Sequence, residues 1–330
     1  MVAMTDKKYR QQSDFKPAWW LRNPHVQTLY PLLDCYFQRI DYRLELVDLP
    51  DGDFLELAFA GQPSAPCCCL LPGTEGSKNS PYIKMMTKAL LALGLQVVVM
   101  QYRSCGKAIN QLPKAYNSLD TGDFEFVLSY LFIKHQIRVQ HAVGFSMGGN
   151  LLVHYLESHP HSFEAAVGVS TPFDMYESAF QLPRFYQRYI LRSSVKKAEE
   201  KLDRGIALPV SKTQLKQLKT MPEFDNCLTA PLYGFSDVES YYKAARCYPL
   251  LASIKTPLLM LHALDDPFIP RHTVPAANTC SPTVELKSTQ YGGHLGFVAG
   301  RLPLSKDYWF IDQVLQFLML HGLAASSTAD

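Results

Sequence analysis

The pattern of hydrophobic and polar residues changes near residue 67 of the chain. Before that point, residues 42–49 and 54–60 alternate apolar and polar side chains on either side of the turn-forming sequence PDGD at 50–53. This alternation predicts two antiparallel strands joined as a hairpin. From Cys67 onward, continuous apolar runs are separated by amphipathic segments, which is typical of a parallel sheet buried on both faces.

Strand-length apolar runs and helical segments alternate as far as residue 170, and the alternation resumes after residue 254. This order predicts an α/β fold with a mostly parallel central sheet that begins with the antiparallel hairpin. The expected strands are 67–71, 95–102, 139–145, 165–170, 258–264 and 284–288, and the expected helices are 81–93, 120–136, 147–158, 272–280 and 307–321.

The pattern between residues 171 and 254 is different, because helical periodicity and many aromatic residues occur there without a convincing buried strand. We therefore expect a helical cap inserted into the sheet sequence. The predicted organisation is an N-terminal extension packed on the core (1–40), an α/β core in two parts (41–171 and 251–323), the helical cap insertion (172–250) and a flexible tail (324–330).

Composition excludes several classes of protein. The 330 residues are 47% hydrophobic with a formal net charge of +2, which is typical of a globular chain with a substantial core. Without a long Lys/Arg run, so small a charge does not indicate nucleic-acid binding. Residues 1–17 lack the apolar core of a signal peptide, and no apolar run is long enough to span a bilayer, so a cytoplasmic location is expected.

The eight cysteines do not form the pattern of a disulfide framework or a zinc site. Cys67, Cys68 and Cys69 are consecutive within an apolar run, where alternate residues of a strand point to opposite faces. We expect them to be small buried hydrophobic residues. No cysteine pair is combined with a second pair, or with a histidine pair, at zinc spacing. The sequence predicts neither a metal nor an organic cofactor.

Ser146 is the first candidate for chemistry, because it lies between two glycines at the junction of a predicted strand and a predicted helix. The sequence Gly144-Phe145-Ser146-Met147-Gly148 fits the G-x-S-x-G pattern of a nucleophile elbow. In such a turn the glycines let strand and helix approach closely, and the serine hydroxyl projects outward. Taken alone, the pattern also fits a simple turn, so other segments of the sequence must distinguish a nucleophile elbow from a turn.

A serine nucleophile requires a base to accept its proton and a carboxylate to orient that base. In α/β-hydrolases these residues follow in the order serine, acid, histidine. Asp265 and Asp266 come directly after the predicted strand 258–264, and His294 follows the strand 284–288 in a glycine-rich turn. Each position lies past the carboxyl end of a strand, the edge at which open parallel sheets bind ligands.

Because Asp265 and Asp266 are adjacent, either could be the carboxylate that orients the histidine. Asp266 is favoured because Pro267 biases its backbone towards an extended conformation, and because D-x-x-hydrophobic-P is the common form of the acid loop in hydrolases of this fold. Asp265 is then a solvated or capping neighbour. Four other histidines are expected to be structural: His154, His159, His161 and His262.

The third requirement is a pair of backbone N–H groups that bind the oxyanion. One is expected from Met147, directly after the nucleophile, and the other from the loop PGTEGS at 72–77. Because Pro72 has no N–H, we expect Thr74 to supply the second donor. The alternatives are a simple turn or a phosphate-binding loop, and no Lys-Ser/Thr pair follows at the spacing a phosphate loop needs.

Four motifs together resemble those of the YheT-like α/β-hydrolases: LPGTEGS (71–77), GFSMGGN (144–150), HALDDPF (262–268) and GGHLGF (292–297). The segment HVQT at 25–28 and the hairpin turn at 50–53 also match, so the similarity runs over nearly the whole chain.

This resemblance implies an α/β-hydrolase fold and a serine hydrolase with carboxylesterase-type activity on short-chain or glycerol esters. It implies Ser146, Asp266 and His294 as the triad. The main departure is Pro72, where the family usually has a histidine before the glycine.

The predicted function is hydrolysis of carboxylic esters, short-chain or acylglycerol-type, through an acyl-enzyme. A thioesterase or amidase with the same triad, and a non-catalytic hydrolase-fold module that binds a ligand or partner, remain alternatives. An acyltransferase is disfavoured, because no histidine has an aspartate five residues later.

Residues 184–219 of the cap are distinctly basic. One hypothesis is that a cap helix contacts an anionic membrane surface to reach lipid esters; the alternative is a solvated helix face. The expected partner is a small-molecule ester or lipid substrate, with no nucleic acid, and the oligomeric state is left open. The basic residues recur every four positions beside aromatic ones: Arg184, Arg188, Arg192 and Lys196, next to Phe185, Tyr186 and Tyr189.

Overall fold

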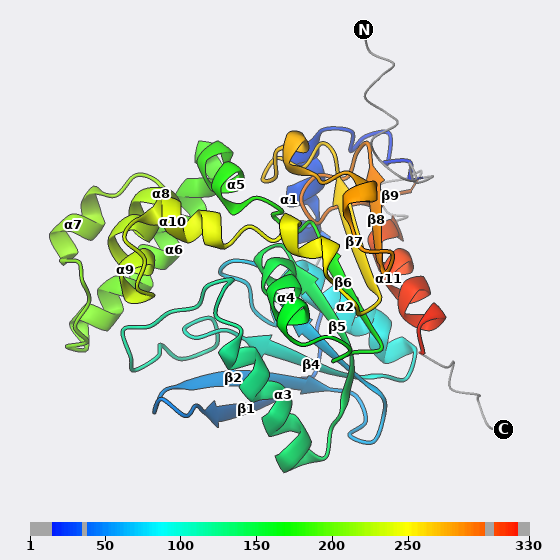
Figure 1. The fold of residues 1–330 in the computed structure, drawn as a ribbon, viewed down its shortest axis with the longest axis horizontal. Helices are drawn as coiled ribbons and strands as arrows, with labels where there is room; N and C mark the ends of the chain where they lie inside the picture. Colours follow the sequence, from blue (N-terminus) through cyan, green and yellow to red (C-terminus); the bar gives the residue numbers. More distant parts are fainter. Residues whose placement is uncertain (1–14, 35–37, 301–306, 323–330) are drawn as a thin grey trace, which may run out of the picture.

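The computed structural model describes residues 15–34, 38–300 and 307–322, and its centre is an eight-stranded sheet of order β1-β2-β4-β3-β5-β6-β7-β8 (Figure 1). The predicted α/β fold is therefore confirmed. The strands are β1 (Arg43–Asp48), β2 (Phe54–Ala60), β3 (Cys67–Leu71), β4 (Gln96–Gln101), β5 (Val139–Phe145), β6 (Ala165–Val169), β7 (Leu258–Ala263) and β8 (Val284–Thr289).

The predicted hairpin begins the sheet. β1 pairs antiparallel with β2, β2 pairs antiparallel with β4, and every later pair from β4 to β8 is parallel. At the hairpin turn the N–H of Leu49 donates to the Asp53 carbonyl at 2.8 Å, and Gly52 adopts a φ of +85°. A side chain at that φ is disfavoured, which explains the glycine.

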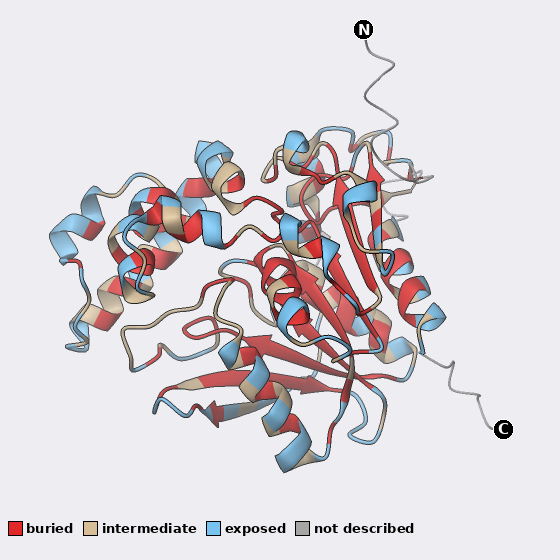
Figure 2. Ribbon diagram, viewed as in Figure 1, coloured by how far each residue is buried: buried red, intermediate tan, exposed pale blue. Residues whose placement is uncertain are grey.

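Helices cover both faces of the sheet. The side chains of α3 (Gly122–His135) and α4 (Met147–Ser158) form one apolar cluster with the sheet, and those of α2 (Pro81–Ala92) and α11 (Trp309–Leu320) form a second. Figure 2 shows strands β2 to β7 almost entirely buried between these layers, whereas the edge strand β1 is mostly exposed. This double coverage explains the continuous apolar runs of the sequence.

The consecutive cysteines divide between these two layers as predicted. Cys67 and Cys69 pack in the cluster with α3 and α4, whereas Cys68 packs in the cluster with α2 and α11. Their thiols are buried and free, and burial raises the pKa of Cys67 to about 12. They therefore act as small core side chains.

The cap lies between β6 and β7 and stands to one side of the sheet (Figure 1). It has a small apolar core of its own, to which Leu191, Leu215 and Leu228 contribute. No strand occurs from residue 170 to 257. The cap helices are α5 (Met175–Gln181), α6 (Arg184–Asp203), α7 (Lys212–Gln217), α8 (Met221–Phe224), the π-helix η3 (Asp225–Thr229), α9 (Ala230–Leu232), α10 (Val238–Ala244) and the 3₁₀ helix η4 (Tyr248–Ala252).

The predicted helix at 272–280 is wrong. The segment forms two short 3₁₀ turns, η5 (Arg271–Thr273) and η6 (Ala277–Thr279), with an extended residue, Val274, after the first. Pro275 has no N–H for a helical bond and disfavours helical dihedrals at the preceding residue, so a continuous helix cannot form there.

The N-terminal extension contributes a helix, α1 (Pro24–Asp34). A two-stranded ribbon of β9 (Val298–Ala299) and β10 (Asp307–Tyr308) was not predicted. The predicted tail at 324–330 lies outside the described residues.

No helix in the described parts of the chain has the length and apolar composition needed to cross a membrane.

Candidate active site

The turn at Ser146 has the geometry of a nucleophile elbow. Ser146 adopts φ +51° and ψ −121°, a sparsely populated region for a residue with a side chain. A Cβ at Gly144 would lie 2.4 Å from the Gly148 carbonyl oxygen, and a Cβ at Gly148 would lie 2.3 Å from that of Leu71. Both flanking glycines are therefore required by the close approach of β3, β5 and α4.

The structure brings the three predicted triad residues together at the carboxyl ends of β5, β7 and β8. His294 Nε2 lies 3.1 Å from Ser146 Oγ, and His294 Nδ1 lies 2.8 Å from Asp266 Oδ2. The Asp266 carboxylate and the imidazole are both buried. A hydroxyl, an imidazole and a buried carboxylate in this line can pass a proton from serine to histidine.

The two adjacent aspartates have different contacts. Asp266 Oδ2 faces the His294 ring, and its Oδ1 accepts the N–H of Phe268 at 2.8 Å. Asp265 Oδ1 instead accepts the N–H of Gly293 at 2.9 Å, and burial raises the pKa of Asp265 to about 6. Asp265 is thus placed to cap the histidine loop, and Asp266 to hold the imidazole.

Phe268 fixes the plane of the imidazole. Its ring stacks on His294 with centroids 4.1 Å apart and an interplanar angle of 1°. The Tyr186 ring of α6 also packs against Phe268, with ring centroids 4.5 Å apart. A cap side chain therefore supports the orientation of His294 through one intervening ring.

The histidines expected to be structural make other contacts. His262 is buried within β7, its ring makes a T-shaped contact with Phe173, and burial lowers its pKa to about 4, so it is neutral at pH 7. His159 stacks on Tyr155 at 4.3 Å. Burial also lowers the pKa of His154.

The loop after β3 lies directly against the serine, since a Cβ at Gly73 would be 3.0 Å from Ser146 Cβ. In this loop the N–H of Gly73 donates to the Tyr82 hydroxyl at 3.0 Å, and that of Glu75 donates to the Tyr116 hydroxyl at 2.6 Å. The N–H between them belongs to Thr74.

Thr74 and Met147 line the same cavity as Ser146. Within the described residues, neither backbone N–H has a hydrogen-bond partner. Two N–H groups that remain free beside a serine hydroxyl are suited to binding an oxyanion. The carbonyl of Pro72, at the start of this loop, accepts the Tyr102 hydroxyl at 3.1 Å.

Glu75 connects this loop to the cap, a role that sequence reasoning missed. It adopts φ +59°, and its carboxylate pairs with Lys197 of α6 at 2.8 Å. The hydroxyls of Ser193 and Tyr116 also donate to that carboxylate. Because Glu75 and Lys197 are far apart in the chain, no local pattern predicts their contact.

Helix α1 holds the histidine loop from the other side. Thr28 Oγ1 accepts the N–H of His294 at 2.9 Å and donates to the Pro24 carbonyl at 2.7 Å. The buried Gln27 side chain bonds both the N–H and the carbonyl of Val298, at 2.8 and 3.0 Å. A Cβ at Gly293 would lie 2.5 Å from the Pro24 carbonyl oxygen. These contacts give Gln27 and Thr28 of the HVQT motif a role that sequence reasoning did not assign to them.

A cavity of about 500 Å³ separates this edge of the sheet from the cap. Ser146, His294, Met147 and Thr74 line it, and most of its other lining side chains are apolar or aromatic. They include Leu182, Ile190, Leu208, Met221, Phe224 and Leu228 from the cap.

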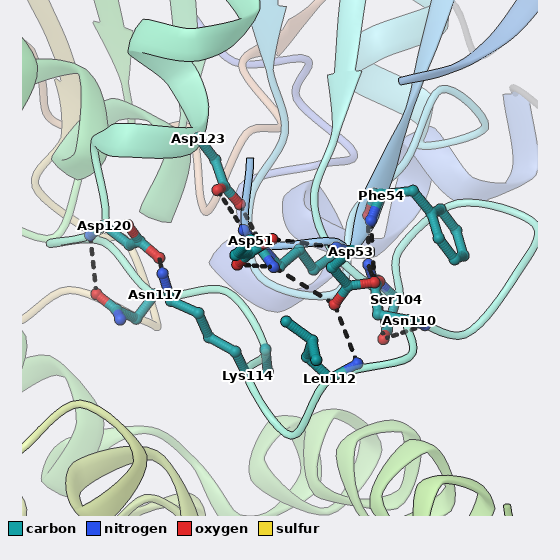
Figure 3. Close-up of polar contacts among 12 residues, drawn as sticks. Asp51, Asp53, Phe54, Ser104, Asn110, Leu112, Lys114, Asn117, Asp120 and Asp123 are labelled. Atoms are coloured by element: carbon teal, nitrogen blue, oxygen red, sulfur yellow. Dashed lines mark hydrogen bonds and ion pairs between the residues drawn. The ribbon is translucent and has the colours of Figure 1, made fainter. Parts of the chain in front are cut away.

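A buried polar network braces the cavity wall formed by the loop after β4 (Figure 3). Arg103 pairs with Asp51 at 2.8 Å and with Asp123 at 2.6 Å, which joins the hairpin turn to α3. The Asp53 carboxylate accepts the Asn110 amide at 2.9 Å and the N–H of Leu112 at 3.2 Å. The turn at 50–53 therefore positions the cavity wall as well as closing the hairpin.

Lys201 of α6 fastens the cap to the same wall. Its ammonium donates to the carbonyls of Leu112 and Lys114 at 2.7 and 2.8 Å, and burial lowers its pKa to about 8. Among the described residues, no group of three or more His, Cys, Asp or Glu side chains is placed to hold a metal ion.

Known proteins are similar to this chain in sequence or in fold. The sequence profile described as "alpha/beta hydrolase fold" matches residues 69–300. The Escherichia coli (strain K12) protein named "Putative esterase YheT" is 33% identical over 98% of this chain and 99% of its own length. A monoacylglycerol lipase of Saccharomyces cerevisiae is 29% identical over 77% of this chain and 59% of its own length.

Human phospholipase ABHD3 is 28% identical over 93% of this chain and 80% of its own length. Among solved structures, the Pyrococcus furiosus esterase Pf2001 superposes with a TM-score of 0.56 at 16% identity, covering 94% of this chain and 99% of that one. This likeness concerns the fold alone. The family match and the similarity to YheT along the full chain show that the chain belongs to the α/β-hydrolase fold family, in the group that contains YheT.

Proposed function

We propose that this chain is a serine hydrolase that cleaves carboxylic esters, and that its substrates are lipid or acylglycerol-type esters. The observation that carries the proposal is the line of hydrogen bonds from Ser146 through His294 to Asp266, which opens into a largely apolar cavity. The names of the relatives, an esterase, a monoacylglycerol lipase and a phospholipase, support the same class of reaction.

In the acylation step, His294 Nε2 accepts the proton of Ser146 as Oγ attacks the ester carbonyl carbon. The N–H groups of Met147 and Thr74 stabilise the negative oxygen of the tetrahedral intermediate. Asp266 stabilises the imidazolium that forms. His294 then donates its proton to the leaving alcohol, which leaves the acyl group on Ser146.

Deacylation repeats these steps with water. His294 accepts a proton from the water that attacks the acyl carbon, and the same two N–H groups bind the second oxyanion. The carboxylic acid leaves and Ser146 regains its proton. Each step uses a group of this chain that lies at the sheet edge of the cavity.

An ester series tests the proposal. Purified protein is assayed on p-nitrophenyl esters from acetyl to palmitoyl, on monoacylglycerols, and on a thioester and an anilide of the same acyl group. We expect ester turnover that is lost in Ser146→Ala. Faster turnover of the thioester or anilide would assign the triad to that substrate instead, and no turnover of any compound would favour a ligand-binding module.

A further inference from the structure

The mouth of the cavity is lined by exposed hydrophobic side chains. Leu29 and Leu32 of α1 and Phe185 and Tyr189 of α6 line the cavity, yet between 37% and 74% of each is exposed. A side chain that lines a cavity and is also exposed lies at its opening. The opening is therefore rimmed by large apolar side chains from two helices.

The outer face of α1 extends this apolar rim. Val26 and Leu33 are 46% and 73% exposed, while Gln27 and Pro31 on the opposite face are buried. A surface helix normally has polar residues on its outward face, whereas α1 exposes apolar side chains and buries the polar Gln27. Contiguous exposed apolar surface of this kind marks a site of interaction.

The two helices meet at one point of the rim. His25 Nδ1 of α1 lies 3.1 Å from the Tyr186 hydroxyl of α6, and the two rings stack with centroids 5.7 Å apart. The exposed residues on either side of this contact therefore form one surface. We call it the cavity rim: Val26, Leu29, Leu32 and Leu33 of α1 with Phe185 and Tyr189 of α6.

Positive charges accompany the part of the cavity rim that α6 contributes. Arg184, Arg188 and Arg192 are exposed beside Phe185 and Tyr189. The acidic residues of these two helices lie at their C-terminal ends: Asp34 is the last residue of α1, and Glu199, Glu200 and Asp203 are among the last five residues of α6. Apolar side chains flanked by arginines complement a bilayer surface with anionic headgroups, into which the apolar groups insert.

We propose that the cavity rim docks on an anionic lipid bilayer and that ester substrates pass from the membrane through the rim to Ser146. The substrate part of this inference rests on the proposed function, whereas the docking part rests on the surface alone. The hypothesis drawn from the basic cap sequence is thereby extended, because α1 supplies most of the apolar contact.

Vesicle co-sedimentation of the full chain tests the docking. We compare phosphatidylcholine vesicles with vesicles that also contain phosphatidylglycerol, and the wild type with Val26→Asp/Leu33→Asp, two rim positions that do not line the cavity. We expect binding to the anionic vesicles that falls by about tenfold or more in the double variant. Arg184→Gln/Arg188→Gln should weaken binding to the anionic vesicles by a similar factor.

The matched control is Phe132→Asp/Ile133→Asp, since these residues of α3 are 58% and 73% exposed and lie at the other end of the molecule from α1 (Figure 1). This variant should sediment with vesicles as the wild type does. No binding to anionic vesicles, or equal loss in the control, overturns the proposal. A dimer in solution that only the rim variant dissociates would also overturn it, because a second copy would then cover the rim.

The same assay on Ser146→Ala separates docking from catalysis. Vesicle binding by this variant should equal that of the wild type. If the wild type binds vesicles but hydrolyses no ester, the proposed function fails and the docking stands. If esters are cleaved but the rim variants bind and cleave vesicle esters as the wild type does, the docking fails alone.

Discussion

The two walls of the cavity are built in different ways. On the sheet wall, Ser146, Asp266 and His294 are buried or half-buried on tight turns whose glycines touch neighbouring backbone. On the cap wall, α6 carries Phe185 and Tyr189, which are mostly exposed, and it is fastened at a few polar points such as Glu75 with Lys197. The packing leaves little room for substitutions on the sheet wall and much more room for them on the cap wall.

This difference separates the reaction from the choice of substrate. Atoms that take part in proton transfer must be held within a few tenths of an ångström, which the packed sheet edge provides. Acyl groups are selected by the shape of an apolar space, which the cap helices provide. Substitutions on the sheet wall should therefore lower kcat, and substitutions in the cap should change the preferred acyl chain.

The largest expected effect distinguishes the two aspartates of the sheet wall. Asp266→Asn should lower kcat by about 10⁴-fold, because an amide facing His294 Nδ1 favours the wrong tautomer. Asp265→Asn should lower it by less than about tenfold, because the amide oxygen can still accept the Gly293 N–H. Steady-state kinetics on one soluble ester measure both, and the reverse ranking would assign the role to Asp265.

The next effect concerns α1, which positions the histidine loop. Thr28→Val removes the acceptor for the His294 N–H and should lower kcat by roughly 10- to 100-fold with little change in KM. Thr28→Ser keeps the hydroxyl and should restore most of the activity. If valine and serine variants have equal kcat, the hydroxyl does not position His294.

A smaller effect is expected from narrowing the cavity on the cap wall. Ala198 of α6 is buried and lines the cavity, so Ala198→Leu should lower kcat/KM for long acyl chains by about tenfold and leave acetyl esters nearly unchanged. Ala207→Leu, at an exposed cap position outside the cavity lining, is the control. Equal losses for short and long chains would show that the cap does not select the acyl group.

The smallest effect is a pH dependence of stability. The pKa of Asp265 is about 6 in the folded chain, above its ordinary value of 3.8. Between these values the folded state holds a proton that the unfolded state has released, so rising pH lowers the free energy of unfolding. Relative to Asp265→Asn, the wild type should lose stability as the pH rises from about 4 to above 6. Urea unfolding across this range measures the difference in free energy of unfolding between the two proteins. A difference that does not change with pH would contradict the raised pKa of Asp265.

Much of the sheet wall could be predicted because its signals are local. The apolar runs predicted the parallel strands, and the glycines at 144 and 148 predicted a turn that places Ser146 at a strand end. The order of Asp266 and His294 along the chain, each after a strand, predicted that they would reach the same edge. The predicted helix at 272–280 was wrong because the prediction followed the alternation of strands and helices and neglected Pro275, which interrupts a helix.

The remaining contacts could not be predicted because they join distant segments. Thr28 supports His294, and Glu75 pairs with Lys197, but each side chain has an ordinary local setting in the sequence. The cavity rim is a similar case. Exposed leucines on α1 resemble core residues in the sequence pattern, and only the fold shows that they face outward.

The central claim is that Ser146 is an acyl-accepting nucleophile activated by His294. Labelling with a fluorophosphonate probe, followed by peptide mass mapping, tests it most directly. We predict one adduct on Ser146, no adduct in Ser146→Ala, and labelling of His294→Ala that is slower by about 10³-fold or more. An adduct on another residue, or labelling that survives in Ser146→Ala, would contradict the account.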